Sequence, residues 1–351
     1  MKMEKQVNEL IDKLAETQSL TKDEIIILIN AINPQLSEYL FAKARNVREK
    51  HYGKDVYIRG LIEFTNYCKN DCFYCGIRKS NKNTCRYRLT PEEIMECCHT
   101  GYDLGFRTFV LQGGEDPEYS DMKIIELIWA IKKDFPDCAL TLSVGERMYE
   151  AYAAFLGAGA DRYLLRHETA NPTHYRRLHP PKMSCEERKK NLYNLKKLGF
   201  QTGAGFMVGS PWQTPEFIAD DLLFLKDLQP EMVGIGPFLP HHDTPFAKME
   251  KGSLELTLFL LGMLRLLLPK VLLPATTALG TIASDGRERG LLAGANVVMP
   301  NLSPKNVREK YLLYDNKIHT DEEAAESKEM LKAKVKSIGY NIVTSRGDAK
   351  R

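Results

Sequence analysis

Three cysteines lie within eight residues of one another, at Cys68, Cys72 and Cys75, in the spacing C-x3-C-x2-C. Tyr74 stands directly before the third cysteine. Three thiolates at this spacing can bind three irons of a 4Fe–4S cluster and leave the fourth iron without a protein ligand. An open metal position serves a reaction, whereas a structural metal site is closed. The spacing therefore predicts an iron–sulfur centre that takes part in chemistry.

A structural zinc site is the alternative interpretation of the three cysteines. Such a site needs four ligands, usually supplied as two pairs. Cys85, ten residues beyond the triad, could be a fourth ligand, but the sequence contains no second pair. We assign no role to the remaining cysteines, Cys97, Cys98, Cys138 and Cys185. We expect a reducing compartment, in which the eight cysteines form no disulfide framework.

The composition excludes several classes of function. The chain has 351 residues, of which 43% are hydrophobic, and a net charge of +3, so nothing demands a nucleic-acid partner. The N-terminus is charged throughout and has no apolar signal-peptide region. The most apolar stretch, residues 254–273, is interrupted by Glu255, Arg265, Pro269 and Lys270. We therefore predict a cytoplasmic protein without a membrane segment.

A repeating unit of strand, helix and glycine begins at Asp55. Strands that alternate with helices predict parallel βαβ units, and eight such units predict a closed (β/α)8 TIM barrel rather than an open sheet. The predicted strands are residues 55–66, 106–111, 139–144, 161–166, 202–208, 232–237, 271–274 and 296–300. Thr90-Pro91-Glu92-Glu93 has the pattern of a capping box that opens a helix.

Segments on either side of the barrel complete the predicted organisation. Residues 1–54 form an N-terminal helical extension, residues 55–304 the barrel, and residues 305–351 a C-terminal segment with a helix packed on the barrel. We expect the charged stretch 320–338 to be that terminal helix and the last dozen residues to fray. Chemistry in such a barrel sits at the C-terminal ends of the strands, and the cysteine triad follows the first strand directly.

Two strand ends carry charged side chains beside small ones. The second strand runs into Gln112-Gly113-Gly114-Glu115, where backbone can approach a ligand closely and the carboxylate could hold an ammonium group. The fourth strand ends at Arg166, and Glu168 follows it with a carboxylate that could bind ribose hydroxyls. Arg188, in the next helix, is a candidate partner for a ligand carboxylate. A glycine turn and a solvated, capped loop remain the simpler interpretations of these two segments.

Three further strand ends are less specific. The fifth strand and the residues that follow it, 202–211, are rich in small residues that leave room for a planar ligand or for close helix packing. After the sixth strand, His241, His242 and Asp243 have the residue types of metal ligands, but the prolines and glycines around them indicate a rigid loop. The seventh strand ends at Thr276 and Thr277, whose hydroxyls suit a small polar or anionic substrate or simple helix capping.

The cysteine motif with its preceding aromatic residue resembles the hallmark of the radical S-adenosylmethionine (SAM) superfamily. The segment Gly113-Gly114-Glu115 resembles the superfamily's site for the methionine amino group, and Val208-Gly209 resembles its adenine-facing strand. A closer resemblance, to the FeFe-hydrogenase maturase family HydE, extends over nearly the whole chain. It rests on the strings YLLRHETANP, TGAGFMVG, VGIGPFLPHHDTP, PATTALGT and GANVVMPN.

The resemblance implies two cofactors, one 4Fe–4S cluster held by the three cysteines and SAM bound to the open iron. It implies that Tyr74 packs near adenine, that Glu168 faces the ribose, and that Arg188 pairs with the methionine carboxylate. The cofactor-binding residues that it implies are Tyr74, Gly113, Gly114, Glu115, Ser143, Arg166, Glu168, Arg188 and Met207. One electron then cleaves SAM into methionine and a 5′-deoxyadenosyl radical, while the barrel positions the reactants and excludes water.

The resemblance also implies a substrate and partners. The substrate would be a small anionic complex, a cysteine-ligated iron carbonyl cyanide made by another maturase, on the way to the hydrogenase H-cluster. The contact positions that it implies, besides Arg166, are Arg59, Gln112, Thr141, Met232, Thr276, Thr277, Tyr311 and Tyr314. Arginines and threonine hydroxyls in an apolar barrel fit such an anion. A one-electron donor and other hydrogenase maturases, including a scaffold protein, are the expected partners.

The chain departs from the family in one respect. Some HydE proteins carry a further cysteine triad near the C-terminus, but no cysteine follows Cys185 here, and residues 318–323 read IHTDEE. We therefore expect one cluster only. Two other hypotheses remain: a radical SAM mutase or sulfur-handling enzyme of the biotin synthase and methylornithine synthase group, and a non-catalytic, zinc-stabilised barrel that binds a partner.

Overall fold

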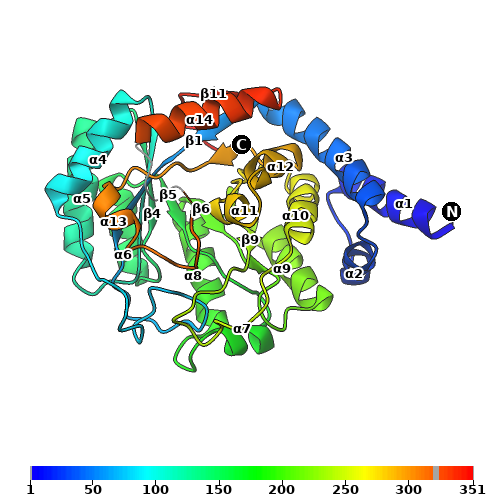
Figure 1. Ribbon diagram of the computed structural model, residues 1–351, viewed down its shortest axis with the longest axis horizontal. Coiled ribbons are helices and arrows are strands. Elements are labelled where there is room, and N and C mark those ends of the chain that lie inside the picture. Colours follow the sequence, from blue (N-terminus) through cyan, green and yellow to red (C-terminus); the bar gives the residue numbers. More distant parts are fainter. Residues whose placement is uncertain (1, 319–323, 351) are drawn as a thin grey trace.

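The computed structural model describes residues 2–318 and 324–350. Its centre is a parallel sheet that helices surround on the outside (Figure 1). Six strands follow one another in this sheet in the order of the sequence. They are β2 (Gly60–Thr65), β3 (Thr108–Gly113), β4 (Ala139–Ser143), β5 (Arg162–Leu164), β6 (Gln201–Ala204) and β8 (Met232–Val233).

Two further strand positions close the sheet into a barrel. Met232 of β8 bridges to Leu272, and Pro274 bridges to Val297, so residues 272–274 occupy the seventh position. The eighth position is β10 (Val297–Val298), which pairs with β1 (Asp55–Ile58). The predicted (β/α)8 TIM barrel is therefore confirmed. The strand residues that pack against the outer helices are apolar, whereas polar strand residues such as Gln112 and Thr141 line the cavity inside the barrel.

Several strands are interrupted where the sequence predicts continuous ones. The first strand divides at Arg59 into β1 and β2, and β1 turns away to join a small sheet in the order β10-β1-β11. The fifth and sixth positions continue, after short breaks, as β7 (Met207–Val208) and β9 (Gly236–Pro237), which pair with each other. The break in the fifth position contains Gly205, whose φ of +156° suits a glycine.

The helices of the repeat lie outside the strands. The predicted capping box is confirmed, because Thr90 and Glu93 exchange side-chain and backbone hydrogen bonds at the start of α4. The longer helices are α4 (Pro91–Asp103), α5 (Asp121–Asp134), α6 (Tyr149–Ala158), α8 (Cys185–Leu198), α9 (Pro215–Leu228) and α10 (Leu254–Leu267). The shorter ones are α7 (Pro172–Leu178), α11 (Thr277–Ile282), α12 (Gly286–Leu292) and α13 (Lys305–Arg308).

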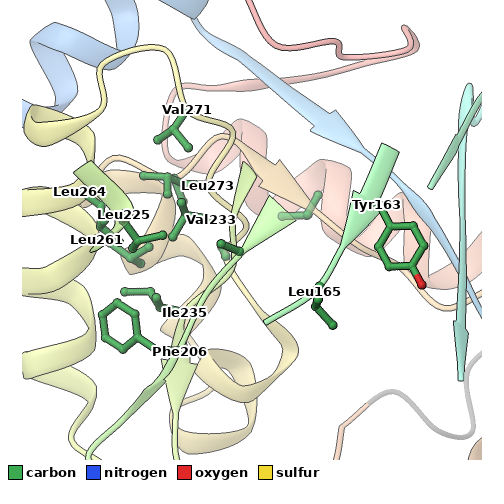
Figure 2. Close-up of a cluster of buried hydrophobic side chains, with 14 of the residues drawn as sticks. Tyr163, Leu165, Phe206, Leu225, Val233, Ile235, Leu261, Leu264, Val271 and Leu273 are labelled. Atoms are coloured by element: carbon green, nitrogen blue, oxygen red, sulfur yellow. The ribbon is translucent and has the colours of Figure 1, made fainter. Parts of the chain in front are cut away.

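Aliphatic and aromatic side chains fill the space between the strands and the outer helices. Figure 2 shows Val233 and Leu273 of the strands near Leu225 of α9 and Leu261 of α10. Each of these side chains is at most 1% exposed. Burial of a Val or Leu side chain contributes roughly 1.5–3 kcal/mol, so this layer is a main source of the barrel's stability. The barrel interior is left to the polar residues described below.

Three N-terminal helices cover one side of the barrel (Figure 1). They are α1 (Lys2–Thr17), α2 (Lys22–Asn30) and α3 (Pro34–Tyr52). Helices α1 and α3 pack on α10, and α2 packs on α9. Among the described residues, no helix is long and apolar enough to cross a membrane. The division of the chain at residues 54 and 304 and its cytoplasmic location remain predictions.

The C-terminal segment differs from its prediction. Helix α14 (Ala324–Ser337) lies within the predicted helix 320–338, of which residues 320–323 are outside the described part of the chain. The expected fraying of the last dozen residues is wrong. Strand β11 (Asn341–Val343) pairs with β1, and Arg346 and Asp348 bond to the strand residues Thr108 and Arg162. The tail is therefore the floor of the barrel at the N-terminal ends of the strands.

Candidate active site

A cavity of about 360 Å³ runs through the barrel from the cysteine loop towards the floor. This volume is within the usual range for small-molecule sites. Every site residue predicted from the sequence lines this one cavity: Arg59, Cys68, Cys72, Tyr74, Cys75, Gln112, Gly113, Gly114, Glu115, Thr141, Ser143, Arg166, Glu168, Arg188, Met207, Met232, Thr276, Thr277, Tyr311 and Tyr314. The structure places these residues together, and the role of each remains a prediction.

The cysteine loop at the outer end of the cavity is held by backbone hydrogen bonds to three neighbouring segments. The amide of Lys69 donates to Glu115 O at 2.9 Å, that of Phe73 to Leu178 O at 3.0 Å, and that of Gly76 to Leu313 O at 3.0 Å. Gly114 packs directly beneath the loop, because a Cβ at this position would lie 2.2 Å from Tyr67 O. The glycine pair thus lets two loops touch, in addition to any role towards a ligand.

The number of thiols at the outer end of the cavity distinguishes a cluster from a structural zinc site. Cys68, Cys72 and Cys75 line the cavity, whereas Cys85, the candidate fourth zinc ligand, is exposed and does not line it. Three thiolates are one ligand short of a structural zinc site but suit a 4Fe–4S cluster with one open iron. Burial raises the pKa of all three thiols, that of Cys72 to about 12, so metal binding must displace protons. The donor set therefore fits the cluster rather than zinc.

Tyr74 is held from behind by a histidine that the sequence analysis did not select. Its hydroxyl lies 3.1 Å from Nε2 of His179, and the two rings meet edge to face at 5.4 Å. Burial lowers the pKa of His179 to about 3, so the ring is neutral. Tyr175 stacks on the other face of His179 at 3.9 Å. Nothing in the spacing of Tyr74 and His179 along the chain signals this contact.

Arg166 and Glu168 stand together at the end of the fourth strand position. Nη2 of Arg166 lies 3.1 Å from Oε2 of Glu168, yet the pair is not aligned for a hydrogen bond. Glu168 adopts a φ of +63°, an uncommon conformation for a glutamate, and its amide donates to Gly205 O at 3.0 Å. The strained backbone aims an unsatisfied carboxylate into the cavity, which fits a carboxylate that binds ligand hydroxyls.

Arg188 and Glu115 already have partners within the protein. Arg188 contacts the carboxylate of Glu146 and donates to Arg166 O at 2.7 Å. Glu115 pairs with Lys69 at 3.1 Å and accepts a hydrogen bond from the amide of Glu146 at 3.0 Å. A ligand's carboxylate and ammonium groups would therefore exchange with these internal partners. The pairing of Arg188 with a methionine carboxylate remains a prediction.

The inner half of the cavity contains buried polar atoms without partners. Arg59 is 5% exposed, with Nε and Nη2 unpaired among the described residues and Nη1 2.9 Å from the sulfur of Met232. Burial, and next the charge of Arg162, place the pKa of Arg59 well below its usual value. The hydroxyls of Thr141 and Thr276 also lack partners. Because buried polar groups are normally hydrogen-bonded, these atoms mark a place for a polar ligand.

A buried ion pair beside this cavity was missed from the sequence. Lys317 lies 2.6 Å from Oε1 of Glu63, and Asn301 donates to Oε2 of the same carboxylate at 2.8 Å. Both Glu63 and Lys317 line the cavity, next to Tyr311, whose carbonyl accepts from Lys317 at 3.0 Å. Glu63 is a charged residue within an apolar strand, which is a signal in the sequence. Lys317 has no such signal because it lies 254 residues away.

Two histidine groups outside the cavity have structural explanations. His167 is fully buried beside Asp221 at 3.3 Å, and burial lowers its pKa to about 3. His241, His242 and Asp315 have ligand atoms within 4.8 Å. However, His242 lies between Asp315 at 2.7 Å and Asp243 at 3.2 Å, and its hydrogen bond to Asp315 raises its pKa. This group is therefore a network of ion pairs.

Comparisons with known proteins agree with this geometry. A family model described as the Radical SAM superfamily matches residues 62–225. The FeFe-hydrogenase maturase subunit HydE of Thermotoga maritima is 48% identical over 310 residues, 88% of each chain. The chain belongs to the radical SAM superfamily, in its HydE family. It is therefore a radical SAM enzyme, and its family implies a 4Fe–4S cluster and SAM.

More distant relatives share the fold of this radical SAM enzyme. The 3-methylornithine synthase of Methanosarcina barkeri is 31% identical over 309 residues, 87% of this chain and 86% of the relative. The crystal structure of methylornithine synthase (PylB) superposes with a TM-score of 0.84 at 29% identity, covering 95% of this chain and 97% of the other. The family assignment, with Cys85 outside the cavity, favours the radical SAM enzyme over a zinc-stabilised, non-catalytic barrel.

Proposed function

We propose that this radical SAM enzyme acts in FeFe-hydrogenase maturation on a small anionic substrate, a cysteine-ligated iron carbonyl cyanide. The observation that carries the proposal is the set of residues that line the cavity. Its outer end holds the three cysteines, Tyr74 and Glu168, and further in lie cationic and hydroxyl groups without hydrogen-bond partners among the described residues. A cofactor half and a substrate half within one cavity are what a radical transfer between them requires.

The residues of the outer end would hold the cofactors. Cys68, Cys72 and Cys75 would ligate three irons of one 4Fe–4S cluster, and the open position would take SAM. The bound cluster and SAM supply the electron and the 5′-deoxyadenosyl radical. Tyr74, fixed by His179, would pack against the adenine, and Glu168 would accept hydrogen bonds from the ribose. The backbone of Gly113 and Gly114, which lines the cavity, would lie close to the methionine.

The inner end would hold the substrate. Arg59 at the inner end and Arg166 beside Glu168 have N–H groups without hydrogen-bond partners among the described residues, and the hydroxyls of Thr141 and Thr276 also lack such partners. Cyanide nitrogens and a carboxylate are acceptors that satisfy such donors without adding bulk. The buried Glu63–Lys317 pair and Tyr311 bound this region and exclude water from it. Exclusion of water protects a reactive radical from side reactions.

A Cys72→Ala variant tests the proposal. In a cell-free or cellular maturation assay, we expect hydrogenase activity to fall to the level seen without the enzyme, because one of three iron ligands is lost. Iron analysis and electron paramagnetic resonance of the wild type should show one 4Fe–4S cluster whose g-values shift when SAM is added. Full hydrogenase activity with Cys72→Ala, or a spectrum that SAM does not change, would refute the proposal.

A radical SAM reaction on an organic substrate is the second candidate. The resemblance to methylornithine synthase in sequence and fold favours it, because unpaired arginine and threonine donors also suit an amino-acid carboxylate. The two proposals differ in what stimulates SAM cleavage. If an amino acid or a thiol-containing organic molecule accelerates formation of 5′-deoxyadenosine and the iron complex does not, the organic substrate is favoured. The scaffold partner and the hydrogenase target are expected only if the first proposal is correct.

A further inference from the structure

The cysteine loop has an outer face that the cavity does not use. The three cysteines and Tyr74 line the cavity, whereas Phe73, between Cys72 and Tyr74, does not. Phe73 packs edge to face against Phe246, with ring centroids 6.2 Å apart. Its amide is bonded to Leu178 O at the end of α7. The chain next to a proposed iron ligand therefore makes its aromatic contacts outside the cavity.

These contacts continue into a strip of aromatic and cationic side chains. The rings of Phe246 and Trp212 are 5.6 Å apart. The guanidinium carbon of Arg177 lies 5.7 Å from the ring centroid of Trp212, and that of Arg78 lies 5.9 Å from the ring centroid of Phe73. We call these five residues, in the order Arg78, Phe73, Phe246, Trp212 and Arg177, the basic aromatic strip. Phe246 is buried and Arg78 pairs with Asp71 at 2.7 Å, so Trp212 and Arg177 are the exposed members of the strip.

Trp212 has the properties of a contact residue rather than of a core residue. It is 46% exposed, although tryptophan is usually well buried. Its φ of +63° is a left-handed conformation that costs a non-glycine residue of order 1–3 kcal/mol. The side chain packs on Phe246 and Arg177, yet the residue remains 46% exposed on a strained backbone. Tryptophan and arginine are the side chains most enriched in the energetic centres of protein interfaces.

The surroundings of the strip are strongly basic. The two segments that meet here, residues 72–90 and 172–183, contain eight Lys and Arg residues and no Asp or Glu. Lys79 and Arg176 extend the two ends of the strip and are exposed. Lys182 precedes Met183, which contacts the sulfur of Cys72 at 3.8 Å. Within the described chain, no carboxylate pairs with Lys79, Arg176, Arg177 or Lys182, so their field is available to an acidic partner.

We propose that the basic aromatic strip is the docking surface for a small acidic protein that carries one electron. The inference rests on the proposed function, because reductive cleavage of SAM consumes an electron. The carrier is oxidised by one electron and the cluster is reduced by one, with no bond formed or broken in either protein. Phe73 is joined to Cys72 by a single peptide bond, so a carrier on the strip comes close to an iron ligand. Small, charge-steered contacts are typical of such short-lived redox complexes.

Binding of an oxidised acidic flavodoxin to the iron-reconstituted enzyme tests the proposal without any turnover. Isothermal titration at low ionic strength should show binding that weakens as salt is added. The variant Arg176→Glu/Arg177→Glu should raise the Kd about tenfold or more. A matched variant, Lys133→Glu/Lys197→Glu, makes the same change of net charge at the helix ends below the barrel, and its Kd should stay within about twofold of the wild type.

Trp212→Gly isolates the aromatic contribution. Glycine adopts a positive φ without strain, which offsets part of the packing lost against Phe246 and Arg177. This variant should therefore remain folded in urea unfolding while its Kd for flavodoxin rises about tenfold. Cytochrome c, a basic electron carrier, should not bind any of the proteins. A wild type that does not bind flavodoxin, or an Arg176→Glu/Arg177→Glu variant that binds as tightly as the wild type, would overturn the docking surface.

The reductant separates failure of the docking surface from failure of the proposed function. With dithionite, which needs no docking, Arg176→Glu/Arg177→Glu should cleave SAM at the wild-type rate. With reduced flavodoxin, the same variant should be about tenfold slower at limiting carrier. Equal rates with both reductants would refute the surface alone. Absence of SAM cleavage by the wild type with dithionite would refute the proposed function, while the binding data would still decide the surface.

Discussion

Arg162 at the floor of the barrel and Arg166 near its mouth come from the same strand position, yet they differ in how many of their nitrogens have hydrogen-bond partners. Arg162 is fully buried, and all of its nitrogens are satisfied, by Gln201, Thr108, Arg346 O and Asp348. Nε and Nη2 of Arg166 lack hydrogen-bond partners. The floor resembles an ordinary buried ion pair, whereas the mouth resembles a site prepared for a ligand.

Buried polar groups with partners stabilise the fold, whereas buried polar groups without partners are suited to binding a ligand. A buried donor with its partner is neutral or mildly favourable for folding, whereas one without a partner costs roughly 1–3 kcal/mol. The protein bears that cost at Arg59, Arg166, Thr141 and Thr276, all of which line one cavity. Proteins retain buried donors without partners at sites where a bound ligand supplies the missing acceptors. Variants at the floor should therefore reduce stability, and variants at the mouth should reduce binding.

The largest expected effect is on stability. Arg162→Ala removes the floor's central cation and leaves a cavity, so we expect the free energy of unfolding in urea to fall by about 3–5 kcal/mol. The dithionite-driven rate of SAM cleavage per folded molecule should stay within about twofold, because Arg162 does not line the cavity. A change of the SAM KM by more than tenfold would contradict this division between floor and mouth.

Arg166→Met is the matched change at the mouth. The substitution removes an incompletely paired charge, so the free energy of unfolding should change by less than about 1 kcal/mol in either direction. The kcat/KM for SAM cleavage should fall about tenfold to a hundredfold, because the side chain of Glu168 loses its neighbouring cation and the ligand loses two donors. Unfolding in urea and steady-state kinetics on the same preparation would check both parts. A loss of stability with unchanged kinetics would show that Arg166 stabilises the fold and does not serve ligand binding.

Two threonines offer a finer comparison. Thr276→Val removes a hydroxyl without a partner and should leave stability unchanged or slightly higher, while maturation activity falls about threefold to tenfold. Thr108→Val removes a hydroxyl that donates to Arg346 O at 2.8 Å and accepts from Arg162 at 3.1 Å. It should cost about 1–2 kcal/mol of stability and leave maturation unchanged. Thermal melts and the maturation assay on both variants check these expectations. A loss of stability in Thr276→Val, or a loss of maturation activity in Thr108→Val, would contradict them.

Acid sensitivity gives the smallest effect. Burial alone would raise the pKa of Asp348, but hydrogen bonds from Gln201 and Arg346 and the charge of Arg162 outweigh it and lower the pKa well below 3.8. The folded pKa is thus depressed, so the contribution of Asp348 to stability is present above about pH 4 and is lost as the pH falls further.

Asp348→Asn should remove that contribution. Because the carboxylate is 40% exposed, solvent screening limits the expected loss to about 1 kcal/mol at pH 7. The difference between wild type and variant in urea unfolding should shrink between pH 4 and pH 2. A difference that stays constant over this range would show that the side chain acts through its shape rather than its charge.

Much of the fold and half of the site could be read from local patterns. The C-x3-C-x2-C spacing, the Thr90 capping box and the strand–helix alternation each depend on residues within about one element of each other, and the structure has them where expected. The errors fall where distant segments meet. The break of the first strand at Arg59 and the ordered C-terminal tail both arise from β1 pairing with β10 and β11, which no local pattern specifies.

By itself the sequence determined the (β/α)8 barrel and the position of three candidate iron ligands, Cys68, Cys72 and Cys75, directly after its first strand, because cysteine spacing and helix capping are encoded within a few residues. The tertiary structure alone decided which charges are paired. Asp348 reaches Arg162 across 186 residues, and Lys317 reaches Glu63 across 254, whereas no described residue satisfies Arg59 Nη2. The difference between a structural and a binding arginine lies in partners that only closure of the barrel brings near.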